Sequence, residues 1–216
     1  MQPFTVHDGL CATLSRSDVD TDQIIPKQFL KRTDKDSYGD ACFFTWRYDD
    51  DMHPRPDFEL NDPRYAGASV LVTGDNFGCG SSREHAAWAL LGYGFRVVVA
   101  PTFADIFRTN ALQNGLLPVA LTVAEVELLS RRARSEDGYR VRVDLEAQSV
   151  SDSHGLVARF EMEEFWRECL LEGLDPISMA LKREPEIAAY ERRRSPLLPT
   201  TTGLAGPPLP RSSDPG

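Results

Sequence analysis

The chain has 216 residues, of which 41% are hydrophobic and 26% are charged, and its formal net charge is −9. This composition is typical of a globular protein with one core-forming domain, alone or with appendages. The acidic balance argues against nucleic acid as a partner, because phosphate binding needs a basic face. No apolar run approaches the roughly 20 residues that a membrane-spanning helix needs, so no membrane partner is expected.

The N-terminal residues Met1–His7 carry neither the basic nor the apolar segment of a secretion signal. The cysteines, Cys11, Cys42, Cys79 and Cys169, are far apart and form no C-x-x-C pair. We therefore expect no metal site and no iron–sulfur ligand set from this chain alone. These features predict a cytoplasmic protein with reduced thiols.

In chain order, residues 4–14 are predicted to form a pair of short strands or one bulged strand, with Gly9 at the break. Aspartates then recur at Asp18, Asp20 and Asp22, which could suggest a calcium loop. The pattern lacks the glycine and the distal glutamate of an EF-hand, so turn and capping roles are favoured.

Pro26 can open a short helix, after which Lys31 and Arg32 place two cations on a loop. Residues 34–68 are turn-rich and aromatic, which predicts a long excursion with short helices and not a separate domain. An excursion of this length inside a compact domain is unusual unless it serves a site or an interface.

From Ser69 onwards, apolar strand patterns alternate with helical patterns. The expected strands are 69–73, 95–100 and 116–121, and the expected helices are 82–92, 103–112 and 122–134. Alternation of this kind predicts parallel strands joined by helices, and therefore an α/β fold.

After Gly138 the period changes to two. Residues 139–145 alternate as a half-buried strand should, with a hairpin partner expected around 155–160. Further helices are expected at 163–171, 176–182 and 184–193. The stretch from Ser195 is rich in Pro, Gly, Ser and Thr, so we predict one domain over 1–194 and a disordered tail over 195–216.

A glycine-rich turn, residues 74–82, joins the strand at 69–73 to the next helix. A P-loop needs a lysine after Gly80, a dinucleotide fingerprint needs a glycine where Arg83 stands, and the G-x-S-x-G elbow of hydrolases is absent. The simplest remaining interpretation is a turn with Ser81 as the helix N-cap, because Ser81-x-x-Glu84 is a capping box.

The cap leaves Ser82, Arg83, Gly78 and Gly80 unexplained. Glycines beside a helix start let a ligand approach the backbone closely. Arg83 supplies a planar fork that matches a carboxylate, and a serine in such a positive field can give up its proton. These features favour proton abstraction beside the carboxylates of a small polycarboxylic acid.

The stretch Asn76–Ala89 closely resembles the signature of the aconitase-superfamily swivel domain, and in particular that of bacterial 3-isopropylmalate dehydratase small subunits. The resemblance covers roughly residues 4–192 and continues in the same order through Val19–Leu30, Gly94–Phe107, Asn114–Pro118 and Val143–Gln148. It implies a three-layer, swivelling β/β/α domain with a mixed sheet.

Members of this family are hydro-lyases of leucine biosynthesis, which interconvert 2- and 3-isopropylmalate by removing and re-adding water. The resemblance implies a heterodimer or higher assembly whose large subunit carries a [4Fe–4S] cluster, so that this chain binds no cofactor itself. Ser81 matches the serine that abstracts the proton, and Arg83 matches a ligand of the dicarboxylate substrate. Ser82 and the backbone at Gly80 would complete the anion pocket.

The loop Phe29–Thr33 resembles the segment that contacts the substrate side group, and the sequence leaves open whether Lys31 or Arg32 reaches it. Two alternatives also remain open. One is the small subunit of a related hydro-lyase acting on homoaconitate, citraconate or a methylmalate, and the other is a non-catalytic carboxylate-binding module.

Four residues beside the expected catalytic positions are predicted to have structural roles only. Gly78, Glu84 and His85 would support the loop, His85 through a hydrogen bond, and Cys79 would be a small residue packed beside the site.

Overall fold

The computed structural model describes residues 1–32 and 35–194. The chain divides into two compact units, residues 1–176 and 177–216. The second unit contains most of α7 (Pro176–Lys182) and all of α8 (Glu184–Arg193), where helices are predicted. The predicted tail from Ser195 lies outside the described residues. In the part of the chain that the structure describes, no helix has the length and apolar character that crossing a membrane requires.

The first unit is built on one seven-stranded mixed sheet with the order β4-β3-β2-β1-β5-β6-β7. Four strands run parallel, and the helices between them cross over as the alternating pattern predicts. These elements are β1 (Val6–Leu14), β2 (Val70–Thr73), α3 (Glu84–Tyr93), β3 (Val97–Ala100), α4 (Asp105–Asn114) and β4 (Leu117–Ala120). β2 and β3 are buried along their whole length, because both faces of the parallel half are covered.

β1 is one continuous strand, so the predicted break at Gly9 is wrong. Its first half pairs antiparallel with β5, and its second half pairs parallel with β2 from Cys11 onwards. A Cβ at Gly9 would lie 2.5 Å from Cγ2 of Val70. The glycine therefore allows a close approach between strands at the point where β1 changes partner.

The other half of the sheet is a meander of β5 (Arg140–Asp144), β6 (Ser149–Asp152) and β7 (Val157–Arg159). The predicted hairpin partner of β5 is wrong, because β5 pairs with β6, and β7 pairs with β6 in turn. Gln148, at φ 48°, helps to turn the chain early. The sequence of β6 has a single apolar residue, Val150, which is too little for a recognisable strand pattern.

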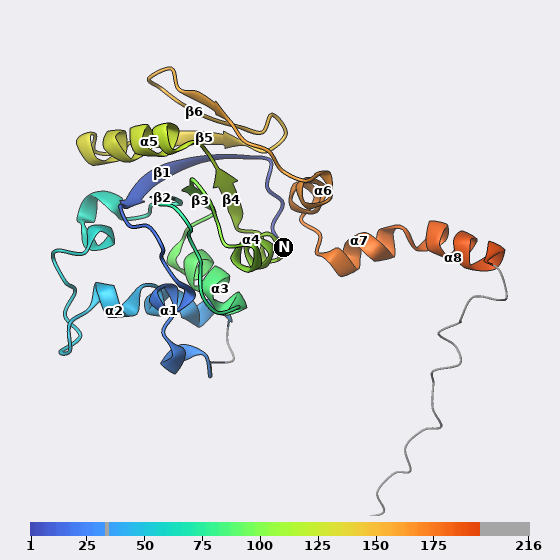
Figure 1. Cartoon of the computed structure of the whole chain (residues 1–216), viewed down its shortest axis with the longest axis horizontal. Helices are drawn as coiled ribbons and strands as arrows, with labels where there is room; N and C mark the ends of the chain where they lie inside the picture. Colours follow the sequence, from blue (N-terminus) through green and yellow to red (C-terminus); the bar gives the residue numbers. More distant parts are fainter. Residues whose placement is uncertain (33–34, 195–216) are drawn as a thin grey trace, which may run out of the picture. The chain divides into compact units, whose positions relative to one another are not determined.

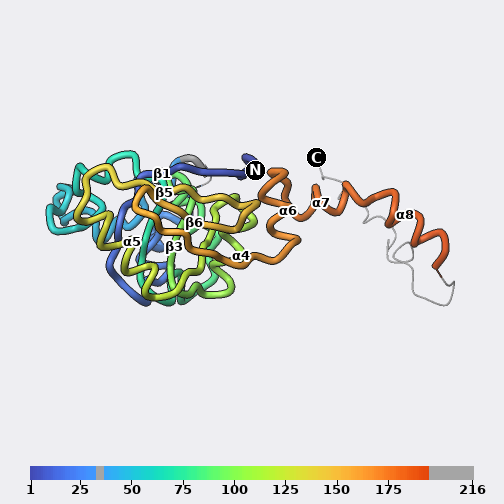
Figure 2. Tube along the Cα trace, turned by 90° about the horizontal axis from the view of Figure 1, so that it is seen from above, coloured from blue at the N-terminus to red at the C-terminus, as the bar shows by residue number. Residues whose placement is uncertain are grey.

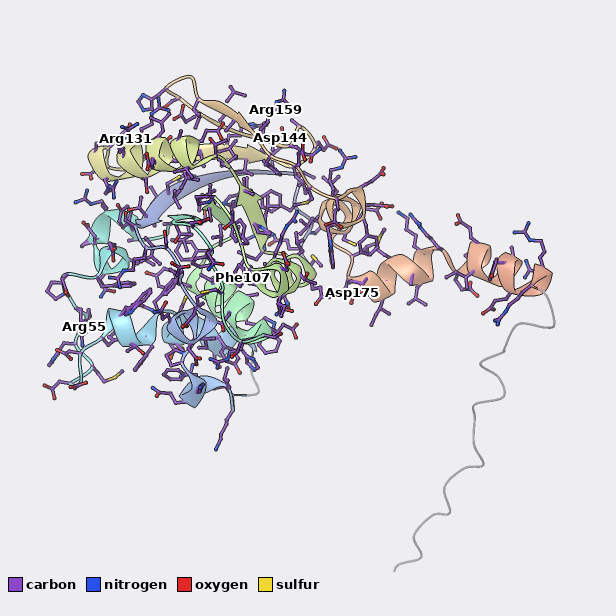
Figure 3. The ribbon with its side chains drawn as sticks, viewed as in Figure 1. Arg55, Phe107, Arg131, Asp144, Arg159 and Asp175 are labelled. Carbon is purple, nitrogen blue, oxygen red and sulfur yellow. The ribbon has the colours of Figure 1, made fainter. Side chains whose placement is uncertain are left out.

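Two hydrophobic cores lie on the two faces of the parallel strands, which confirms the three-layer α/β architecture (Figures 1 and 2). One core joins the sheet to α3, α4 and the excursion, and the other joins it to α5 (Val123–Ser135) and the antiparallel strands. Figure 3 shows Phe107 inside the helical layer, whereas Arg131 and Arg159 project outwards. α6 (Glu164–Glu172) packs its Leu170 into the second core.

The region between β1 and β2 consists of short helices, as predicted. They are α1 (Thr21–Ile24), η1 (Lys27–Phe29), η2 (Lys35–Ala41), α2 (Phe44–Arg47), η3 (Glu59–Asn61) and η4 (Pro63–Tyr65). η2 packs directly on α3, where a Cβ at Gly39 would lie 2.2 Å from the carbonyl oxygen of Gly92. Tyr38 and Phe43 are fully buried, so the excursion contributes to the core.

A buried carboxylate fastens α5 to the antiparallel strands. Asp152 has a side chain that is 0% exposed and forms an ion pair with Arg132 of α5. It also accepts hydrogen bonds from the Tyr139 hydroxyl and from the backbone N–H groups of His154 and Leu156. Burial alone raises the pKa of a carboxyl group, but these bonds outweigh it and hold the pKa of Asp152 below the ordinary 3.8.

Replacing this carboxylate by an amide, Asp152→Asn, should lower the free energy of unfolding at neutral pH by about 2 kcal/mol, because the charge-assisted bonds are lost. Since the folded-state pKa is depressed, the contribution of Asp152 is present above the unfolded-state pKa and disappears as the pH falls through the folded-state value. Urea unfolding at pH 7 and at about pH 3 should show the difference from wild type shrinking in acid. Equal destabilisation at both pH values would contradict the assignment.

Candidate functional site

The glycine turn follows β2 at the carboxyl end of the parallel strands, between the loops that follow β1 and β3. In open α/β sheets this edge is where ligands bind. Each loop continues the parallel order for a few residues, through isolated bridges from Asp20 to Cys79 and from Phe77 to Phe103. The turn is therefore held between two neighbouring segments.

On the β1 side, three hydrogen bonds hold the part of the turn from Gly78 to Ser81. The N–H of Thr21 donates to the carbonyl oxygen of Cys79 at 2.9 Å, and its hydroxyl donates to that of Ser81 at 2.7 Å. The N–H of Gly78 donates to the carbonyl oxygen of Val19 at 2.7 Å. The backbone from 78 to 81 is thus positioned by α1 and the residues that precede it.

On the β3 side, Phe77 exchanges backbone bonds with the next loop. Its N–H donates to the carbonyl oxygen of Thr102, and its carbonyl accepts from the N–H of Ala104, both at 3.1 Å. Gly78 has φ +78°, and a Cβ there would lie 2.2 Å from Cγ of Phe107. Only glycine fits this position, for reasons of both backbone conformation and space.

Of the three aspartates after β1, Asp20 has the capping role expected of it, whereas Asp18 and Asp22 bind side chains of the glycine turn and its end. Asp18 accepts from the Asn76 side-chain amide at 2.7 Å. Asp20 is the N-cap of α1 and closes a capping box with Gln23. Asp22 forms an ion pair with the guanidinium of Arg83.

Helix α3 begins at Glu84, two residues later than expected, and its N-cap is Arg83 in an extended conformation at φ −146° and ψ 108°. The predicted N-cap at Ser81 and its capping box are therefore wrong. Thr21 ties the carbonyl of Ser81 to α1, which places the serine ahead of the cap position. The Glu84 carboxylate accepts from the Asn114 side chain at 3.0 Å instead.

No side chain caps the first turn of α3, so its N–H groups and positive dipole end face the turn. Ser81 and Ser82 are both exposed, and neither hydroxyl is bonded to another described residue. Gly80 is exposed at φ +88°, and a Cβ there would come no closer than 3.4 Å to Asp20. The turn therefore presents two hydroxyls beside a helix start, which can accommodate an anion.

Arg83, which the sequence assigns to a substrate carboxylate, is 9% exposed and is paired with a carboxylate of the protein. One guanidinium nitrogen bonds to Asp22 and contacts the carbonyl oxygen of Ile25 at 3.4 Å. The Asp22 side chain is 40% exposed, so the pair lies at the surface of the site. Sequence reasoning missed Asp22 as this partner, although the aspartate run was the available signal.

Arg32 and Lys31 differ in how far they are engaged. Arg32 binds both carboxylate oxygens of Asp40, at 2.6 and 3.3 Å, and lies 4.7 Å from the ring centroid of Phe29. The hydrogen bond between Arg32 and Asp40 raises the pKa of Arg32 and lowers that of Asp40. Lys31 is exposed and has no ion pair within the described ranges.

His85 lies in the first turn of α3 and packs against η2 through ring contacts. Its ring lies 5.4 Å from that of Tyr38 and 4.7 Å from that of Trp88, and the Tyr38 hydroxyl donates to the carbonyl of Arg32 at 2.6 Å. Within residues 1–32 and 35–194, the side chain of His85 makes none of the hydrogen bonds to the loop that were predicted for it. Burial lowers its pKa below the ordinary 6.5, so the ring is neutral at pH 7.

Cys79 lies in the turn, and burial raises the pKa of its thiol, helped by the negative charges of Asp20 and Asp18. The other cysteines are buried, and all four are unpaired. Within the described residues, no group of three His, Cys, Asp or Glu side chains is arranged to hold a metal ion. The four cysteines, which all lie in the described part of the chain, are not grouped as ligands of an iron–sulfur cluster would be.

Two family models match the chain. The model described as the Aconitase C-terminal domain matches residues 1–124, and the model described as LeuD_N matches residues 127–164. The matched range of the first model contains the glycine turn and both flanking loops.

Curated relatives match over nearly their full length. The 3-isopropylmalate dehydratase small subunit of Bacillus pumilus is 51% identical over 195 residues, covering 90% of this chain and 98% of the relative. That of Brevibacillus brevis is 51% identical over 194 residues, covering 90% and 100%. The crystal structure of 3-isopropylmalate dehydratase from Methanocaldococcus jannaschii aligns with a TM-score of 0.61 at 29% identity, covering 86% of this chain and 99% of that one.

The two glycines of the turn should respond differently to the same substitution. Gly78→Ala should destabilise the fold by about 3 kcal/mol or more, because a left-handed backbone and an overlap with Phe107 add together. Gly80→Ala should cost only about 1–2 kcal/mol, because only the backbone is strained. Thermal unfolding of both variants measures this, and equal losses would contradict the packing assigned to Gly78.

Proposed function

The chain belongs to the family of 3-isopropylmalate dehydratase small subunits of the aconitase superfamily, and from that membership we propose how its glycine turn serves the reaction. The enzyme is a hydro-lyase of leucine biosynthesis. It removes water from 2-isopropylmalate to give isopropylmaleate and adds water back at the neighbouring carbon to give 3-isopropylmalate. The observation that carries the proposal is the pair of unbonded serine hydroxyls at the uncapped start of α3.

Ser81 is the base. Its Oγ takes the proton from the substrate carbon beside a carboxylate, the electron pair forms the carbon–carbon double bond, and the bond to the hydroxyl on the adjacent carbon breaks. The positive end of α3 favours the deprotonated oxygen. Thr21 fixes the backbone that carries Ser81, so the base is held in one place before substrate binds.

Arg83 and Ser82 hold the substrate carboxylate. The Arg83 fork makes the bidentate contact, while Ser82 and the backbone at Gly80 donate to the same anion. In the free chain, Asp22 forms an ion pair with one nitrogen of the Arg83 guanidinium. Lys31 is the cation that reaches the substrate from the neighbouring loop, since Arg32 is already bonded to Asp40.

The turn is half of an active site. A [4Fe–4S] cluster on a large subunit would supply the Lewis acid that accepts the departing hydroxide, which takes up a proton and leaves as water. The two chains would assemble as a heterodimer or higher assembly in the cytoplasm. The alternatives of a related hydro-lyase and of a non-catalytic module receive no support from the names of the relatives. Co-purification with the large subunit and an anaerobic assay on 2- and 3-isopropylmalate test the whole proposal.

Ser81→Ala should leave the free energy of unfolding within about 0.5 kcal/mol of wild type, because Ser81 caps no helix. In the reconstituted pair, kcat should fall by about a thousandfold or more, because the base is lost. Ser82→Ala is the matched control and should retain more activity. A Ser81→Ala enzyme with nearly wild-type kcat would show that another group is the base.

Arg83→Lys should raise KM by about tenfold or more, because a point charge replaces the fork. Asp22→Asn keeps the size of the partner and should produce a smaller change, since the amide still faces the guanidinium. Steady-state kinetics of the reconstituted pair measure both effects. Unchanged kcat and KM in Arg83→Lys would exclude the carboxylate contact.

A further inference from the structure

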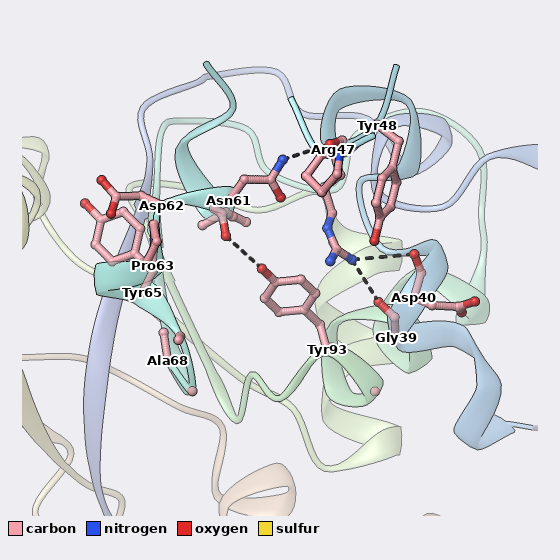
Figure 4. Close-up of a pocket in the computed structure, with 15 residues that line it drawn as sticks. Gly39, Asp40, Arg47, Tyr48, Asn61, Asp62, Pro63, Tyr65, Ala68 and Tyr93 are labelled. Atoms are coloured by element: carbon pink, nitrogen blue, oxygen red, sulfur yellow. Dashed lines mark hydrogen bonds between the residues drawn. The ribbon is translucent and has the colours of Figure 1, made fainter. Parts of the chain in front are cut away.

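A pocket lies at the end of α3 that is opposite to the glycine turn. Because α3 has 10 residues, the helix separates the two by about 15 Å. It is an open concavity with a volume of about 510 Å³, lined by residues of η2, α2, η3, η4 and the end of α3. Its walls are partly polar and partly apolar: Asp40, Arg47 and Asn61 line it together with Leu60, Tyr65 and Tyr93. Figure 4 shows Tyr93 beside Arg47 and Asp40. Nothing in the proposed dehydratase mechanism uses this pocket.

Arg47 is the cation of the pocket. Its guanidinium carbon lies 5.1 Å from the ring centroid of Tyr48 and 4.8 Å from that of Tyr93. Figure 4 shows the guanidinium directed towards the carbonyl groups of Gly39 and Asp40. Nη1 reaches these oxygens only at 3.4 and 3.5 Å, the outer limit of a hydrogen bond.

The rest of this guanidinium is unsatisfied. Among the described residues, Arg47 Nε is the one buried side-chain nitrogen or oxygen without a hydrogen-bond partner, and Nη2 is unbonded as well. No described carboxylate forms an ion pair with Arg47. A partly buried guanidinium with unsatisfied donors costs folding free energy unless an anion accepts hydrogen bonds from it.

The carboxylates of the pocket are already committed elsewhere. Asp40 holds Arg32, and Asp62 holds Arg64 at 2.7 Å. Neither can neutralise Arg47 without breaking its own pair. The pocket therefore carries one uncompensated positive charge, although the chain as a whole has a net charge of −9.

We propose that this pocket binds a small carboxylate with an apolar body. The carboxylate binds Nη2, which bonds to none of the described residues, and the apolar body lies against the apolar part of the wall at Leu60 and Tyr65. A volume of 510 Å³ falls within the ordinary range of small-molecule sites.

The walls are fixed before a ligand arrives. The Asn61 amide donates to the carbonyl oxygens of Arg47 and Arg55, both at 2.8 Å, and the Tyr93 hydroxyl donates to that of Leu60 at 3.0 Å. Such pre-organisation reduces the ordering cost of binding.

The position of Asp40 gives the pocket a route to the active site. Its carbonyl faces Arg47, while its carboxylate holds Arg32, next to Lys31. A ligand on Arg47 would therefore lie beside the residue that holds Arg32.

The test is isothermal titration of the full chain with 4-methylpentanoate, with the neutral 4-methylpentanamide as the matched probe. We expect saturable binding of the acid with a Kd of about 1 mM or tighter and at least about tenfold weaker binding of the amide. Arg47→Gln should raise the Kd at least about tenfold, and Arg47→Lys should lie between it and wild type. Arg131→Gln removes an equal charge from α5 and should leave the Kd unchanged.

No saturable binding of the acid up to about 50 mM, or equal binding of acid and amide, would overturn the proposal even if Arg47 variants failed to fold. Binding that Arg47→Gln leaves unchanged would overturn it too. The titration is repeated with the chain assembled with its large subunit. Retained binding supports a free ligand, whereas its loss would show that a partner side chain fills the pocket, against the proposal. Because the chain alone is titrated first, failure here leaves the dehydratase assignment intact.

Discussion

The site depends on the bonds by which Thr21 holds the glycine turn. Its N–H and hydroxyl engage the carbonyl oxygens on either side of Gly80, so one residue of α1 positions the backbone on which Ser81 stands. Because these carbonyls face α1, the chain cannot fold Ser81 back over the helix start. The first turn of α3 is left open for an anion, and the serine hydroxyl is left free for chemistry.

The long excursion between β1 and β2 gives this arrangement its rigidity. η2 approaches α3 so closely that Gly39 and Gly92 leave no room for a side chain, and Tyr38 packs between the substrate loop and His85. The excursion therefore couples both ends of α3. One end carries the glycine turn, and the other carries the Arg47 pocket, where Asp40 is bonded to both Arg47 and Arg32.

The elements that could be predicted from sequence are those with strong local patterns. The buried strands β2 and β3, the amphipathic helix α5 and the strand–helix alternation were all predicted, because apolar periodicity reflects burial directly. β6 was missed because its residues are mostly polar, and the break at Gly9 was wrong because its glycine serves a close strand approach and not a bend. Start residues of helices are less certain than helices themselves, as α3 shows.

The sequence by itself determined the family and the α/β fold and singled out the glycine turn as the candidate site, since the residue types at 76–89 are specific and local. Only the tertiary structure decided what those residues touch. It showed that Ser81 is not a cap, that Arg83 is held by Asp22, and that Arg32 is bonded to Asp40 while Lys31 forms no ion pair with any described residue. Ion pairs and caps between distant segments depend on three-dimensional proximity, which periodicity and spacing along a chain do not encode.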